Sequence, residues 1–248
     1  MGYLQDQKGI LSRYFREKDN WSAHLHNCHN FIQRVVSQDE IRSIAILGSG
    51  WLLDVPMDFL IDRMEKIWLV DIFHPREIRH QYKQYNNIEY IEDDITGDGI
   101  QKVYDYVKEK RKRTDNNISS LKPADYHLPF PRPDLVVSLN LLNQLDILLV
   151  DYLLSKNKGF PEDLTAFRKS VQQQHLNFLL KRKSILISDM TEHRIHLKTQ
   201  KIEKHALVHV HLPEGKEKKT WTWIFDTHGL YYEGCQTNFE VKAVNLTQ

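Results

Sequence analysis

Residues 43–54, SIAILGSGWLLD, decide the fold of this chain. A short apolar run over residues 43–47 ends at Gly48-Ser49-Gly50, and an amphipathic stretch follows it. A glycine turn after the first strand of an α/β sheet lets the backbone approach a bound ligand closely. The segment therefore predicts a first strand that ends at a ligand-binding turn.

Short apolar runs recur along the chain, separated by stretches with helical spacing. The runs span residues 66–70, 88–91, 134–139 and 184–188, and the helical stretches span 56–64, 75–85, 98–112, 141–155 and 163–182. Five β-rich runs separated by helices predict a parallel sheet that is covered on both faces. Residues 221–226 and 239–246 are two further strand candidates, joined by a segment too short for a crossover helix. They predict an antiparallel pair at the end of the sheet.

Three other stretches complete the organisation. Residues 3–36 carry apolar side chains at helical spacing and predict two helices ahead of the main fold. We expect residues 1–40 to form a helical extension and residues 41–248 a Rossmann-like domain. A basic run at 108–113 leads into a proline-containing loop over 114–133, whose length is typical of a lid or a mobile segment. Residues 205–212 are a further strand candidate.

Polar side chains end the predicted strands. Asp71 ends the second strand, twenty-one residues after Gly50, where an acid can bond both hydroxyls of a ribose. Asp93 and Asp94 end the third strand, where a side chain can meet the exocyclic amine of an adenine. Asn140 and Asp189 end the fourth and fifth strands. Because the carboxyl ends of parallel strands lie on one rim, these groups predict a shared ligand site.

In these segments the chain resembles the class I, Rossmann-like S-adenosylmethionine-dependent methyltransferases. The resemblance covers residues 41–246. IAILGSG resembles the glycine motif, IWLVDI the next strand with its ribose-binding acid, and IEYIEDDIT the adenine-contacting segment. PDLVVSLNLLNQL resembles the fourth strand with the helix after it, and residues 239–246 resemble the closing antiparallel strand of the family.

The resemblance implies a doubly wound, mostly parallel seven-stranded sheet with a terminal antiparallel strand. It implies S-adenosyl-L-methionine as the cofactor and a transferase activity toward an unidentified acceptor, a small molecule by expectation. Asp94 is the preferred adenine contact and Asp93 the alternative. The implied cofactor-binding residues are Gly48, Ser49, Gly50, Asp71, Ile72, Asp93, Asp94, Ile95 and Asn140.

Two positions depart from the family pattern. Ile46 stands where the family often has an acid, and Leu52 replaces the third motif glycine. We expect Leu52 to narrow the space for the methionine part of the cofactor and Asp54 to lie near its amino group. A nicotinamide-dependent dehydrogenase is a rival on the same architecture, but its fingerprint needs a glycine where Leu53 stands.

The acceptor and the catalytic residues are not fixed by any motif. The Asn-Pro-Pro-Tyr-type motif of many amino-group methyltransferases is replaced here by Ser138-Leu139-Asn140-Leu141, and no active-site cysteine motif is present. Elimination leaves an oxygen or small-molecule acceptor. The alternative is a non-catalytic module that binds S-adenosylmethionine or a nucleotide, because fold does not establish activity. The missing third glycine and the absence of a catalytic signature both favour this alternative.

Several aromatic, histidine and cysteine residues outside the strand ends have both a functional and an ordinary structural interpretation. Trp21 or His24 is a candidate to line the cofactor pocket from the N-terminal helices. His24 and Cys28 share a helix face, but two ligands do not make a zinc site, so no metal is predicted. His193, just after the fifth strand, is a candidate base. Trp51 is expected either in the core or beside the ligand.

The composition excludes several classes of protein. The chain has 248 residues, with 34 Lys and Arg against 33 Asp and Glu, so it lacks the basic excess that nucleic-acid binding usually needs. Two cysteines exclude a disulfide scaffold. No signal peptide or membrane-spanning stretch is recognisable. We expect a cytoplasmic protein with no nucleic-acid or membrane partner, and its oligomeric state is left open.

Overall fold

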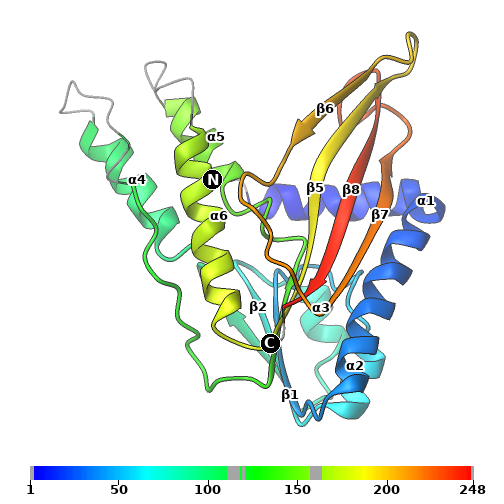
Figure 1. Ribbon diagram of the computed structural model, residues 1–248, viewed down its shortest axis with the longest axis vertical. Helices are drawn as coiled ribbons and strands as arrows, with labels where there is room; N and C mark the ends of the chain where they lie inside the picture. The colour runs from blue at the N-terminus through cyan, green and yellow to red at the C-terminus, as the bar shows by residue number, and fades with distance from the viewer. Residues whose placement is uncertain (1–2, 111–117, 119–120, 157–163, 247–248) are drawn as a thin grey trace.

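The computed structural model describes residues 3–110, 118, 121–156 and 164–246 (Figure 1). Its sheet has eight strands, seven of them in the order β3-β2-β1-β4-β5-β8-β7, and β6 pairs with β5 alone. The parallel strands are β1 (Ser43–Leu47), β2 (Lys66–Asp71), β3 (Ile88–Glu92), β4 (Leu135–Leu139) and β5 (Ser184–His196). The antiparallel pairings add β6 (Ile202–Ala206), β7 (Glu217–Asp226) and β8 (Cys235–Asn245).

Helices cover both faces of this sheet. The helices are α1 (Tyr3–Gln38), α2 (Met57–Arg63), α3 (Arg76–Gln81), α4 (Gly99–Lys110), α5 (Ile147–Lys156) and α6 (Thr165–Leu180). Successive strand residues point to opposite faces, so Ile44 and Ile46 pack with α1 and α2, while Ala45 and Leu47 pack with α4, α5 and α6. The doubly wound fold with an antiparallel end is therefore confirmed.

The N-terminal helix α1 bends at Glu17, which has non-helical backbone angles (φ −108°, ψ 19°). The two helices predicted for residues 3–36 are thus the two arms of one kinked helix. Trp21 and Phe31 on its second arm are buried in the core that the sheet also forms. The helix consequently shares its hydrophobic core with residues 41–248.

Strand β5 is longer than predicted, because it continues from Ser184 to His196 instead of ending at residue 188. Its second half forms an antiparallel ribbon with β6 and β8, which Figure 1 shows extending away from the parallel part of the sheet. Residues 202–206 form β6, so the strand expected at 205–212 is largely wrong. Every residue of β6 is exposed, and a strand with two polar faces lacks the apolar alternation that marks a strand in a sequence.

Two further elements differ from the prediction in extent. Helix α5 begins at Ile147, because turns occupy residues 142–146 after the positive φ of Asn140 (48°). The predicted loop at 114–133 lies partly outside the described residues, as does the basic run beyond residue 110. Its residues 121–133 contain no helix or strand, and Tyr126 on it is buried. No helix within the described part of the chain has both the length and the apolar composition needed to cross a membrane.

Candidate functional site

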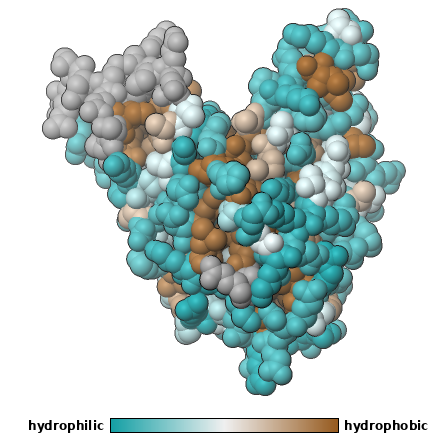
Figure 2. All heavy atoms as spheres, in the orientation of Figure 1, coloured by the Kyte–Doolittle hydropathy of each residue, from teal (hydrophilic) through white to brown (hydrophobic). Residues whose placement is uncertain are grey.

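A cavity of about 610 Å³ lies at the carboxyl ends of the parallel strands. Figure 2 shows the molecule hollowed between an arm formed by the helices α4–α6 and an arm formed by β5–β8, with hydrophobic side chains in the hollow. Asp151 of α5 and Glu192 of β5 both line the cavity, so both arms contribute to it. The lining includes all nine predicted site residues: Gly48, Ser49, Gly50, Asp71, Ile72, Asp93, Asp94, Ile95 and Asn140.

The glycine turn brings bare backbone to the cavity. Gly48 has φ 79°, and a Cβ on it would lie 2.8 Å from the backbone oxygen of Leu139. Its amide donates to the carbonyl of Val70 at 2.9 Å, which fastens the turn to β2. Gly50 follows with φ 43°. Only glycine satisfies both the left-handed backbone and the close approach at position 48.

Asp71 is held against this turn. The Gly50 amide donates to its Oδ2 at 2.8 Å. Burial raises the pKa of this carboxyl, while hydrogen bonds from the backbone of Gly50, Phe73 and Ile72 oppose the rise. The carboxylate therefore has a fixed position beside the glycine turn.

The two acids after β3 differ in their surroundings. Asp94 accepts hydrogen bonds from the amide and hydroxyl of Thr96 and, at 3.2 Å, from the amide of Ile100, so it caps the start of α4. Asp93 accepts from the Asp94 amide at 2.9 Å and from the Tyr126 hydroxyl at 2.8 Å. Burial and the neighbouring Asp93 raise the pKa of Tyr126, so the phenol stays a donor. Both acids line the cavity, and Asp94 accepts more hydrogen bonds from its own loop than Asp93 does.

Asp54 and Asn140 form a pair on the floor of the cavity. Nδ2 of Asn140 donates to Oδ2 of Asp54 at 2.7 Å. Burial raises the pKa of Asp54 to about 6, although the hydrogen bond from Asn140 lowers it. The position of Asp54 on the lining agrees with the expectation that it lies near the site.

Helix α1 contributes aromatic side chains to the lining, as expected for Trp21 and His24. The Trp21 indole donates to the carbonyl of Phe225 at 2.9 Å, and His24 stacks on Trp223 with ring centroids 3.8 Å apart. Burial lowers the pKa of His24 to about 3, so the ring is neutral. Because Trp221 donates to its Nδ1, the proton of His24 resides on Nε2.

Leu52 does not narrow the cavity, and the expectation that it would is wrong. Its side chain is buried in the core on the α1 face of the sheet and is not part of the cavity lining. Its backbone has φ 58°, the left-handed region that a glycine would adopt without strain. Ile46 is likewise a fully buried core residue. Trp51 lines the cavity, whereas His193 does not.

The predicted set lacks several lining residues, among them Glu192, Tyr231 and Tyr232 from the antiparallel half of the sheet and Arg13 from α1. Asp189 was recognised only as a strand end, and it too lines the cavity. Their signal in the sequence is weak, because they come from a β-bulge, a loop and the first arm of α1. Tertiary folding alone brings these segments together.

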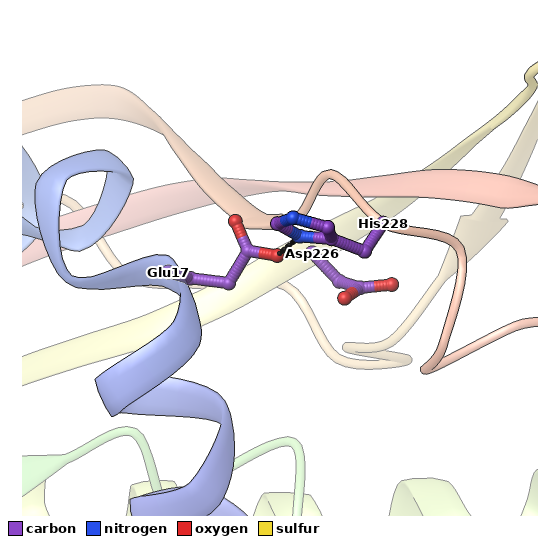
Figure 3. A group of neighbouring side chains, drawn as sticks. All are labelled: Glu17, Asp226 and His228. Carbon is purple, nitrogen blue, oxygen red and sulfur yellow. Dashed lines mark hydrogen bonds and ion pairs between the residues drawn. The ribbon is translucent and has the colours of Figure 1, made fainter.

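Glu17, Asp226 and His228 lie close enough to hold a metal ion, with their candidate ligand atoms within 4.8 Å of one another (Figure 3). Glu17 accepts from His228 Nδ1 at 2.6 Å and from the amide of Thr227 at 3.0 Å. Asp226 accepts from Arg16 at 3.1 Å and from two backbone amides. The group therefore fastens the kink of α1 to the β7–β8 connection, with the carboxylates already bonded to protein donors.

No protein-family model matches the chain, and no curated protein is similar to it in sequence. Solved structures are similar at low identity. The N-methyltransferase NodS from Bradyrhizobium japonicum WM9, in complex with S-adenosyl-L-homocysteine, is 11% identical with a TM-score of 0.44, covering 97% of each chain. The Burkholderia thailandensis 1,6-didemethyltoxoflavin-N1-methyltransferase is 9% identical with a TM-score of 0.41, covering 96% of this chain and 86% of that one. The 23S rRNA methyltransferase ErmE is 12% identical with a TM-score of 0.33, covering 87% of this chain and 67% of that one.

Proposed function

We propose that this protein is an S-adenosylmethionine-dependent methyltransferase with a small-molecule acceptor. The observation that carries the proposal is the convergence on one cavity of a glycine turn and of the acids that end β2 and β3. The carboxyl edge of a parallel sheet is where such folds bind nucleotides. The cavity volume of about 610 Å³ falls in the range of ligand pockets, about 300–1,000 Å³.

The residues present fit S-adenosylmethionine. Gly48 and Gly50 leave room for close approach to the backbone, and Asp71 beside them suits the two ribose hydroxyls. Asp93 or Asp94 suits the exocyclic amine of adenine, and Asp54 suits a ligand amino group. The bound cofactor would supply an electrophilic methyl group on its sulfonium.

The work of the chain is then to bind, orient and exclude water. Trp21 and His24 cover the cavity from α1 with apolar and neutral ring surfaces, which keep water from the reacting groups. The hydrogen bonds that Glu17 accepts from Thr227 and His228, here called the Glu17 clamp, fix the kink of the same helix. Holding an acceptor in line beside a fixed donor is the contribution that such a cavity makes to the rate.

Calorimetric titration of the purified chain with S-adenosylmethionine and S-adenosylhomocysteine tests the proposal, with NADH as the control. We expect micromolar binding of both adenosyl compounds and none of NADH. If neither S-adenosylmethionine nor S-adenosylhomocysteine binds, the proposal is wrong. Micromolar adenosyl binding without turnover over a broad acceptor screen would favour the non-catalytic module.

A further inference from the structure

A β-bulge in β5 turns two acidic side chains into the cavity. The register with β8 shifts between Asp189 and Thr191, so Asp189 pairs with Val241 and Glu192 pairs with Phe239. Val241 and Phe239 both belong to the core on the α1 face, and directly paired residues lie on the same face of a sheet. One extra residue therefore places Asp189 and Glu192, three apart in sequence, on the same side.

Asp189 lacks a counter-charge at this position. Its side chain is 3% exposed, it lines the cavity, and its Oδ1 has no hydrogen-bond partner. Burial and the nearby carboxyl of Asp54 raise the pKa of Asp189 to about 7, although a hydrogen bond from the side chain of Asn143 opposes the rise. Glu192 differs, because Nε and Nη2 of Arg194 each lie 2.7 Å from its Oε2. A buried carboxyl oxygen without a donor is costly, so Asp189 is suited to receive a donor from a ligand.

Aromatic rings stand beside these acids. Phe225 lies 4.9 Å from Tyr231 and 4.7 Å from Phe239, centroid to centroid, and all three rings line the cavity. The guanidinium of Arg13 lies 4.6 Å from the centre of the Phe225 ring and 4.7 Å from that of Tyr231. These ring faces therefore already attract a cation of the chain itself.

The charge of the whole cavity lining also favours a cationic ligand. Among the described residues it holds seven carboxyl side chains, Asp54, Asp71, Asp93, Asp94, Asp151, Asp189 and Glu192, against the guanidinium of Arg13. A concave site lined by one sign of charge concentrates ligands of the opposite sign. An anionic acceptor would be repelled from it.

We propose that the β5 side of the cavity binds the amino group of the acceptor, with Asp189 hydrogen-bonded to the ammonium and the rings of Phe225, Tyr231 and Phe239 packing against the apolar body of the molecule. An ammonium has no lone pair, so it first gives one proton to the Asp189 carboxylate, and the neutral amine that remains is the nucleophile. The acceptor class is a small aromatic or apolar amine. The inference rests on the proposed methyltransferase function, since it names the substrate class of the same site. It also departs from the oxygen acceptor that sequence motifs left open, because a hydroxyl does not need a buried carboxylate without a counter-charge.

Calorimetric titration of benzylamine and of its uncharged analogue benzyl alcohol tests this inference on the purified chain, with and without saturating S-adenosylhomocysteine. We expect benzylamine to bind at least tenfold more tightly than benzyl alcohol. Asp189→Asn keeps the shape of the side chain and should weaken benzylamine binding at least tenfold while leaving benzyl alcohol unchanged. Asp62→Asn, an exposed acid on α2 outside the cavity, is the matched control and should change neither affinity by more than twofold.

Circular dichroism and thermal melting of each variant establish that it is folded. Equal binding of amine and alcohol, or an Asp189→Asn variant that retains the preference for benzylamine, would overturn the inference. The titration of S-adenosylhomocysteine alone separates the two proposals. If that compound binds and the amine preference is absent, the amine site fails and the proposed function stands. If it does not bind and the Asp189-dependent preference is present, the amine site stands and the proposed function fails.

Discussion

The two sides of the cavity are built differently. On the side of β1–β3, the glycine turn brings backbone to the surface, and the carboxylate of Asp71 accepts a hydrogen bond from the Gly50 amide of that turn. On the side of β5, β7 and α1, side chains from distant segments make the surface, and Trp21 meets Phe225 across 204 residues. The first side is set by short-range geometry and the second by tertiary packing.

This difference explains how each side can serve binding. A surface of backbone groups suits a ligand part that stays constant, because those groups change little with side-chain substitution. A surface of aromatic and acidic side chains is set by single residues and suits the part of the ligand that differs between enzymes of one fold. We therefore expect substitutions on the first side to affect the fold or the cofactor, and those on the second to affect the acceptor.

Gly48→Ala should produce the largest effect on the first side. The added Cβ would lie 2.8 Å from the Leu139 oxygen at a backbone φ of 79°. Left-handed strain of about 1–2 kcal/mol and a clash of about 1–3 kcal/mol together predict a loss of roughly 2–5 kcal/mol in the free energy of unfolding. Urea denaturation measures it.

Gly234→Ala is the matched control for this change. Gly234 has φ 73°, but a Cβ there meets nothing within 4 Å. Its loss of stability should be limited to the strain of about 1–2 kcal/mol. Equal losses in both variants would show that close approach at Gly48 is unimportant.

The first side was predictable from the sequence because its signals are local. The glycine turn follows an apolar run, and each acid directly follows a strand, so spacing alone places Gly48, Gly50 and Asp71 at one rim. The cap that Asp94 forms at the start of α4 could not be distinguished from a ligand contact in the sequence, because both use the same residue types. The core position of Leu52 was not predictable, because its left-handed backbone turns the side chain away from the cavity.

Glu17→Ala should give the next largest effect, by releasing α1 from the β7–β8 connection. Glu17 is 1% exposed and accepts hydrogen bonds from Asn20, Thr227 and His228. Removing a buried, charged hydrogen-bond acceptor predicts a loss of about 2–3 kcal/mol, measurable by urea denaturation at pH 7. Asp19→Ala, an exposed acid two residues later on the same helix, should cost less than about 0.5 kcal/mol.

The pH dependence of this clamp has a definite sign. Burial alone would raise the pKa of Glu17, but the hydrogen bonds from His228, Thr227 and Asn20 hold it lowered to about 2. A depressed folded-state pKa contributes stability that is present above the ordinary value of 4.5 and is lost as the pH falls toward 2. The stability difference between wild type and Glu17→Ala should therefore shrink over that window, and a difference that stays constant would contradict the assignment.

Asp71→Asn tests the ribose contact on the first side. The amide keeps an acceptor for the Gly50 amide but removes the charge, so the chain should remain folded. Affinity for S-adenosylhomocysteine should fall about tenfold or more, because hydrogen bonds to a charged group contribute about 1.5–3 kcal/mol. Glu92→Gln is the control. Glu92 is the exposed residue of β3 that pairs with Asp71, and its substitution should leave the affinity for S-adenosylhomocysteine unchanged. Unchanged affinity in Asp71→Asn would remove the ribose assignment.

The second side was less predictable for a physical reason. Asp189 and Glu192 share a face only because of the bulge in β5, and an alternation pattern read from the sequence would place residues three apart on opposite faces. Arg13, Phe225 and Tyr231 meet through the kink in α1 and the β7–β8 connection. No local spacing in the sequence indicates contacts between segments so far apart in the chain. The aromatic segment 221–225, in contrast, was predicted as part of a strand.

Asp189→Asn tests whether the second side of the cavity keeps a ligand-binding carboxyl at the expense of the stability of the fold. Burial and the charge of Asp54 raise the pKa of Asp189 from 3.8 to about 7, so the folded chain binds a proton over this range that the unfolded chain releases. The contribution of this group to the free energy of unfolding therefore falls as the pH rises from about 4 to 7. The Asn variant carries no ionisable group here, so its stability relative to wild type should be greater at pH 8 than at pH 4, as measured by urea denaturation. Asp151→Asn, which changes an exposed carboxyl of the same cavity, is the control and should alter stability by less than about 0.5 kcal/mol at pH 8. An Asp189→Asn variant that is less stable than wild type at pH 8 would mean that the hydrogen bond from Asn143 stabilises the carboxylate more than burial destabilises it, and Asp189 would then be a structural residue.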